Sequence, residues 1–316
     1  MVNKITVVGA GFVGSTIAYT LTLNAVASEI LLVDVAVDKA DGEAMDIDHA
    51  TPFVTNTKVA SGSYADSANS DIIVITAGTN QKPGETRMDM VGRNAKIMRS
   101  VVEEVVKYSP NTILLVVSNP VDVMTQIALD VSGFPKNRVI GSGTNLDSAR
   151  FRYILSQKFG VDPHSINAYI LGEHGDSEFP VWSKVYIGGM GINEASDTFG
   201  GVMKNEDYVT IADEVKNSAY EIIDRKGATY YGIAASVSQI CRAILRNEKT
   251  ILPLSVPLDG QYNLNNVYLS LPVVVGQYGI EKILTPQISE EELGKLYNSA
   301  HVIQDAYNSV KQGGSL

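Results

Sequence analysis

Short apolar runs alternate with amphipathic stretches through the N-terminal half of the chain. The runs lie at residues 5–8, 30–33, 71–76, 112–117 and 138–141. The run at 71–76 is apolar on both faces, which is typical of a strand buried inside a parallel sheet. Helical character is strongest at residues 37–49 and 88–107 between the runs. The alternation predicts an α/β protein with a doubly wound parallel (Rossmann) sheet, which we expect to occupy residues 1–143.

The pattern changes after residue 143. A helix is expected to start at Thr144, followed by a strand at residues 167–171 and helices at 205–224 and 229–246. A β-rich stretch at 250–275 contains the Asp-Gly signal of a tight hairpin turn at residues 258–261. Ser289 and Glu292 form the sequence signature of a capping box, which opens a last helix to about residue 312. Residues 144–316 are therefore predicted to form a second, α+β domain.

A glycine turn follows the first apolar run and opens an amphipathic helix. Its three glycines have separate expected roles: Gly9 makes the tight turn, Gly11 admits a pyrophosphate, and Gly14 permits close packing of helix on strand. The helix N-terminus offers unpaired N–H groups to phosphates. We expect dinucleotide contacts from this turn and from the loop after residue 75, namely from Gly9, Gly11, Phe12, Val13, Gly14, Thr76, Ala77 and Gly78.

Asp34 ends the next strand, at the distance expected for a group that accepts hydrogen bonds from a ribose 2′-hydroxyl. A carboxylate repels a 2′-phosphate, and Val35 offers no cation for one, so the cofactor is predicted to be NAD rather than NADP. A signal peptide is the competing interpretation of residues 4–23. The segment is interrupted by serine, threonine and tyrosine, and a signal peptide leaves Asp34 unexplained.

Composition and charge exclude several classes of function for this chain. The chain has 316 residues, 45% of them hydrophobic, enough for a large core. A net charge of −10 argues against a nucleic-acid-binding surface. Cys241 is the only cysteine, as expected in a reducing cytosol, and no apolar run approaches the ~18 residues of a membrane span. We therefore expect a cytoplasmic protein that binds neither nucleic acid nor membrane.

The residues with candidate chemical roles follow the ends of predicted strands. The loop at residues 77–87 is polar and contains Pro83 and Gly84, which suits either a mobile lid or an ordinary loop. Asn119 is either a ligand-orienting amide or a turn residue before proline. His174, between Gly172 and Gly175, is either catalytic or a turn histidine.

Three motifs, in order behind the glycine turn, resemble the lactate and malate dehydrogenase family over nearly the whole chain. They are residues 80–87 (NQKPGETR), 145–150 (NLDSAR) and 172–176 (GEHGD), and they are most similar to the bacterial lactate branch. The resemblance implies hydride transfer between NADH and a 2-oxo acid, without a metal, by a subunit of a homotetramer or a dimer. Without the resemblance, Thr144 with Asp147 indicates only an N-cap, and Asp147 with Arg150 only a surface ion pair.

By this similarity the site residues have defined roles. His174 is the acid/base, and Asp147 holds its other ring nitrogen. Arg150 binds the substrate carboxylate through two parallel hydrogen bonds, and Arg87 polarises the ketone from the lid. Asn119 orients the substrate and the nicotinamide. Thr229 helps to line the pocket for the substrate's methyl end.

Gln81 is expected to select the substrate. Malate-specific relatives carry arginine at this place, which pairs with a second carboxylate. A neutral amide there favours pyruvate over oxaloacetate, unless the adjacent Lys82 turns inward. The alternatives are a malate or other 2-hydroxy-acid dehydrogenase and, in another class, a non-catalytic NAD-binding sensor.

The resemblance also concerns regulation. Many bacterial relatives bind fructose 1,6-bisphosphate between subunits through an arginine and a histidine. Arg152 matches the arginine, but Asn167 stands where the histidine would be. We therefore expect weak or no activation by the bisphosphate.

Overall fold

The computed structural model describes residues 3–54, 56–79 and 87–312, and of residues 87–89 the backbone only. The first half alternates strands and helices. Its elements are β1 (Lys4–Val8), α1 (Phe12–Leu23), β2 (Glu29–Val33), α2 (Val37–Asp48), β3 (Lys58–Ser61), β4 (Ile72–Ile75), α3 (Arg87–Tyr108), β5 (Ile113–Val116), α4 (Val121–Ser132) and β6 (Val139–Gly141).

The second half mixes helices with short strands and one long hairpin. Its elements are α5 (Asn145–Phe159), β7 (Ile166–Asn167), β8 (Ile170–Leu171), β9 (Phe179–Pro180), β10 (Tyr186–Ile187), β11 (Met190–Gly191), α6 (Ile192–Thr198), α7 (Asn205–Lys226), α8 (Tyr231–Leu245), β12 (Thr250–Asp259), β13 (Asn265–Gly276), β14 (Gly279–Ile283) and α9 (Glu290–Gln312).

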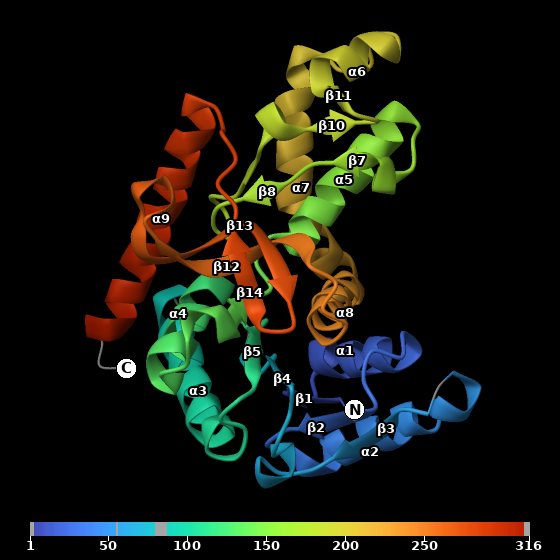
Figure 1. The fold of residues 1–316 in the computed structure, drawn as a ribbon, viewed down its shortest axis with the longest axis vertical. Coiled ribbons are helices and arrows are strands. Elements are labelled where there is room, and N and C mark those ends of the chain that lie inside the picture. The colour runs from blue at the N-terminus through green and yellow to red at the C-terminus, as the bar shows by residue number, and fades with distance from the viewer. Residues whose placement is uncertain (1–2, 55, 80–86, 313–316) are drawn as a thin grey trace.

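Within the described residues the largest sheet has the strand order β14-β13-β12-β6-β5-β4-β1-β2-β3. The strands from β6 to β3 pair in parallel, in the 3-2-1-4-5-6 order of a dinucleotide-binding sheet. The hairpin β12–β13 extends the sheet antiparallel, beginning at the pair Ser255↔Gly141. In Figure 1 the first-half elements lie below, α5 to α7 lie above, and β12 and β13 lie between them. The predicted fold class is confirmed.

The strands form because their residues are apolar on both faces. Every residue of β4 and β5 is buried, as the pattern of residues 71–76 and 112–117 predicted. Helices pack against both sides of such a sheet, and one continuous apolar cluster runs from Ile5 in β1 to Leu271 in β13. In the described part of the chain, no helix is long and apolar enough to cross a membrane.

Two local predictions need correction. The expected strand at residues 167–171 is two short strands, because β7 pairs with β10 while β8 pairs with β9, so the chain changes sheet at Ala168. The hairpin after Asp259 is present, but its connection is longer than a tight turn because a 3-10 turn at Gln261–Asn263 follows Gly260. The capping box at Ser289 and Glu292 is confirmed. The Ser289 backbone N–H donates to the Glu292 carboxylate at 2.8 Å, and the Glu292 backbone N–H donates to the Ser289 hydroxyl oxygen at 3.2 Å.

Candidate active site

The glycine turn between β1 and α1 has the conformation that its sequence predicts. Gly9 has a φ of +104°, which disfavours any residue with a side chain. A Cβ on Gly14 would lie 1.7 Å from the carbonyl oxygen of Gly9, so only glycine lets α1 pack this closely. A Cβ on Gly11 would meet nothing within 4 Å, which leaves the backbone open to a ligand.

A cavity of about 580 Å³ opens beside this turn at the carboxyl ends of the parallel strands. The predicted cofactor residues Gly9, Gly11, Asp34, Thr76, Ala77 and Gly78 all line it. Asp34 accepts hydrogen bonds from the backbone N–H groups of Ala10 at 2.5 Å and Ala36 at 2.8 Å. A carboxylate has about four acceptor positions, so capacity remains for ribose hydroxyls. The open turn, the cavity and this acceptor fit a dinucleotide.

A second cavity, of about 270 Å³, shares Thr76 and Gly78 with the first. Asn119, Arg150, His174 and Thr229 line it, together with Val13 from the glycine turn. These residues are far apart in sequence, and the fold brings them to one hollow next to the dinucleotide cavity. Phe12 lies outside both linings, where it is exposed and stacks on Tyr230 at 5.5 Å between ring centroids.

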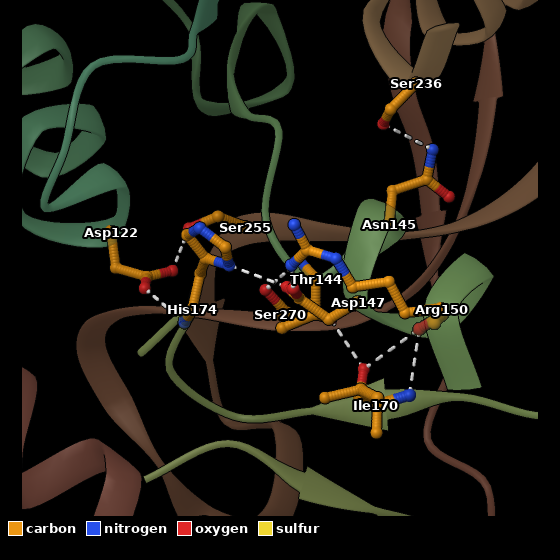
Figure 2. Close-up of polar contacts among 11 residues, drawn as sticks. Asp122, Thr144, Asn145, Asp147, Arg150, Ile170, His174, Ser236, Ser255 and Ser270 are labelled. Carbon is orange, nitrogen blue, oxygen red and sulfur yellow. Dashed lines mark hydrogen bonds and ion pairs between the residues drawn. The ribbon is translucent and has the colours of Figure 1, made fainter. Parts of the chain in front are cut away.

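Hydrogen bonds from β13 and β8 hold the start of α5 and the His174 loop together. Ser270 Oγ accepts a hydrogen bond from the Thr144 backbone N–H, while the Ser270 backbone pairs with Gly172. The Thr144 hydroxyl donates to the carbonyl oxygen of Ile170 rather than capping its own helix. In Figure 2 the side chains of His174 and Asp147 point toward each other, and a dashed line joins them.

His174, Asp147 and Arg150 form a charged group in which Asp147 is buried and the other two side chains are partly exposed. His174 Nδ1 lies 2.6 Å from Asp147 Oδ2, and Arg150 Nη1 lies 2.7 Å from Asp147 Oδ1. The Asp147 side chain is only 2% exposed, so the pair with Arg150 is not a surface ion pair. Because Nδ1 faces Asp147, Nε2 is the ring nitrogen left to exchange a proton with a ligand.

The electrostatics favour a charged imidazole. Burial lowers the pKa of His174, but the Asp147 carboxylate more than offsets this effect and raises that pKa to about 9. Burial alone would raise the pKa of Asp147, yet His174 and Arg150 hold it below its usual range. The group thus stores one proton on the imidazole at neutral pH.

Two acidic residues of the site escaped the sequence analysis. Asp122, in the first turn of α4, accepts hydrogen bonds from the His174 backbone N–H at 2.9 Å and the Ser255 hydroxyl at 2.5 Å. Glu178 lies in the same loop as His174, beside Asp147. Asp122 follows Asn119-Pro120, and Glu178 follows His174 by four residues, but only the folded chain shows that they converge.

Some predicted residues lie elsewhere or outside the described part. Gln81 and Lys82 lie outside the described residues, and Arg87 begins α3 with a side chain that is not described. Arg152 is half-buried on α5, whereas Asn167 is exposed on β7. Neither Arg152 nor Asn167 lines the two cavities.

Family models match both halves of the chain. Residues 3–141 match the lactate/malate dehydrogenase NAD binding domain, and residues 144–313 match the lactate/malate dehydrogenase alpha/beta C-terminal domain. The chain belongs to the lactate/malate dehydrogenase family. It is therefore an NAD-dependent enzyme, and the cofactor prediction is confirmed at this level.

Individual relatives align over nearly their full length. L-lactate dehydrogenase 1 of Clostridium acetobutylicum is 50% identical over 308 residues, and the match covers 98% of each chain. L-lactate dehydrogenase of Acetivibrio thermocellus is 50% identical over 310 residues, with the same coverage. Among solved structures, MGS-M5, a lactate dehydrogenase from a Medee basin deep-sea metagenome library, has a TM-score of 0.96. It is 43% identical, and the match covers 98% of this chain and 100% of that one.

Proposed function

We propose that this protein is an L-lactate dehydrogenase, which interconverts pyruvate and (S)-lactate with NADH and NAD. The observation that carries the proposal is the placement of His174, paired with Asp147, and of Arg150 in one cavity beside the dinucleotide cavity. The named relatives, at 50% identity over nearly the whole chain, support the substrate assignment.

The side chains divide the chemistry. Nicotinamide, when bound, supplies or accepts the hydride. His174 gives its Nε2 proton to the ketone oxygen during reduction and takes it back during oxidation, while Asp147 keeps the tautomer fixed. Arg150 donates one N–H to Asp147 and has others available for the substrate carboxylate, since a guanidinium carries five. Arg87 would stabilise the developing oxyanion, and Asn119 and Thr229 would position the substrate.

The choice of pyruvate over oxaloacetate depends on Gln81. We propose that its neutral amide faces the substrate tail and leaves a second carboxylate without a partner. The test is NADH oxidation with pyruvate and with oxaloacetate, comparing native protein with Gln81→Arg. Preference for pyruvate, shifted towards oxaloacetate in the variant, supports the proposal. Native preference for oxaloacetate contradicts it and makes Lys82 the next residue to replace. Absence of turnover with any 2-oxo acid would contradict the proposed substrate class.

Assembly, location and regulation complete the proposal. We propose a cytoplasmic homotetramer with a dinucleotide domain at 1–143 and a substrate domain at 144–316, and light scattering of the purified protein gives its mass. Asn167 cannot supply positive charge to a phosphate, so Arg152 alone should bind fructose 1,6-bisphosphate weakly. Adding the bisphosphate should therefore change the KM for pyruvate little. A large fall in that KM on adding the effector would contradict this part.

A further inference from the structure

Glu178 shares a loop with His174 and returns toward the same carboxylate. Pairing of Ile170 with Pro180 and of Leu171 with Phe179 closes the loop into a hairpin. The Glu178 backbone N–H donates to the Gly175 carbonyl oxygen at 3.1 Å, which turns the chain back. As a result, one polar side-chain atom each of Asp147, His174 and Glu178 lies within 4.8 Å of the others.

Two carboxyl groups so close cannot both be ionised at low cost. A Glu178 carboxyl oxygen lies within 4.8 Å of a carboxylate oxygen of Asp147. A hydrogen bond between the two groups must be donated by Glu178, because Asp147 is held as the anion. Burial and the Asp147 charge raise the pKa of Glu178 to about 9, against the opposing charges of His174 and Arg150. Glu178 is therefore a neutral acid at physiological pH.

An imidazole with two carboxylates also has the donor types of a metal site. Here, however, the Arg150 guanidinium already lies 2.7 Å from Asp147 and would repel a second cation. The proton between the two carboxyl groups accounts for their proximity without a metal ion.

We propose that Glu178 is a positioning residue that donates a hydrogen bond to Asp147 and so limits how tightly Asp147 retains the proton on His174. Asp147 then divides its charge among three donors: His174 from the hairpin loop, Arg150 from its own helix α5, and Glu178. Asp122 on α4 also faces His174 and accepts a hydrogen bond from its backbone N–H at 2.9 Å. The proposal rests on the roles proposed above for His174 and Asp147.

The sign of the effect follows from the charges. An ionised Glu178 raises the pKa of His174, so a neutral Glu178 leaves that pKa lower. Removal of the Glu178 donor would leave more of the Asp147 charge on the imidazole. Either change hinders release of the proton to pyruvate. The neutral acid thus keeps His174 easier to deprotonate than a plain Asp–His pair would.

The test compares Glu178→Gln, which keeps a neutral donor, with Glu178→Ala, which removes it. The imidazole titrations are followed by NMR of histidine-labelled protein, which has only four histidines, and His174→Gln assigns the signal. In Glu178→Ala the His174 titration should move up by about 0.5 to 1 pH unit, and Glu178→Gln should stay near native. In a plot of kcat/KM for pyruvate against pH, the pH at which the value falls should rise by the same amount in Glu178→Ala.

Equal behaviour of the two variants, whether both shift or neither does, would overturn the proposal. Because the NMR titration needs no turnover, it reports on Glu178 even if pyruvate is not the substrate. Loss of pyruvate activity in the native protein would count against the proposed function alone. Should Glu178→Ala fail to fold by circular dichroism, Glu178→Leu removes the donor while filling more of its space.

Discussion

The backbone N–H of His174 donates a hydrogen bond to Asp122 across the boundary between the two halves of the chain, at 2.9 Å. Asp122 belongs to α4, which follows the parallel strand β5, whereas His174 belongs to the β8–β9 loop. Ser255 on β12 holds the other carboxylate oxygen. The proposed acid/base is therefore fixed by elements from both halves.

Replacement of Asp122 by asparagine should loosen this link. An amide has a single acceptor oxygen, so it cannot accept from both the His174 N–H and the Ser255 hydroxyl as the carboxylate does, and kcat/KM should fall by about 10-fold. Steady-state kinetics with pyruvate check this expectation. Asp259→Asn, at an exposed carboxylate on the end of the same β12 strand, is the control and should change little.

Stability of the Asp122→Asn variant, relative to native protein, should depend on pH in a defined direction. Burial raises the pKa of Asp122 to about 6 in the folded protein, against hydrogen bonds from Ser255 and His174. A raised pKa favours the folded state at low pH, and this contribution is lost as pH rises through 6. An amide does not titrate, so urea unfolding should show a larger gap between native and variant at pH 4.5 than at pH 8. A gap that widens with pH would contradict this burial effect.

Asp147→Asn should shift the pH profile to the acid side. Without the carboxylate that outweighs burial, the pKa of His174 falls from about 9, so less imidazolium is present at pH 8. Pyruvate reduction at pH 8 should drop by about 100-fold or more, and lactate oxidation should drop less, because it needs the neutral ring. Asp162→Asn breaks a similar but exposed pair with His164 and should leave both profiles in place.

Asp34→Ser should relax cofactor choice. Removing the charge lifts the repulsion of a 2′-phosphate and weakens the ribose contact, so the preference for NADH over NADPH should fall by about 100-fold. The measurement is kcat/KM for each cofactor at saturating pyruvate. Asp38→Ser, at an exposed carboxylate in the first turn of α2, tests whether charge near the cavity is sufficient; an equal effect there would refute the assignment.

Gly14→Ala should destabilise the first half. The new Cβ would stand 1.7 Å from the Gly9 carbonyl oxygen, so α1 must move away from β1 at a cost of about 1–3 kcal/mol. The temperature of thermal unfolding should fall, and NADH should bind less tightly. Gly42→Ala places the same methyl group on α2 with nothing within 4 Å, and should instead be neutral or slightly stabilising.

Sequence patterns identified what depends on local geometry. The glycine spacing indicated the turn, and the both-face apolar run at 71–76 indicated buried β4, because both signals lie within a few adjacent residues. The pairing of His174 with Asp147 came from a family resemblance, and the structure places the two in contact. Asp122 and Glu178 were missed, since an isolated acidic residue is ordinary until the fold brings it to a buried partner.

The junction of β6 with β12 also bears on how the protein is made. A ribosome releases β6 (Val139–Gly141) well before β12 (Thr250–Asp259), which supplies its neighbour on the open side of the sheet. Until then the nascent sheet ends in β6, which pairs with β5 on one side only, and the unpaired outer edge of such an apolar strand associates readily with other chains. While the protein is being synthesised, the incomplete chain should therefore depend on chaperones. Variants truncated before β12 should aggregate rather than accumulate as a free nucleotide-binding fragment.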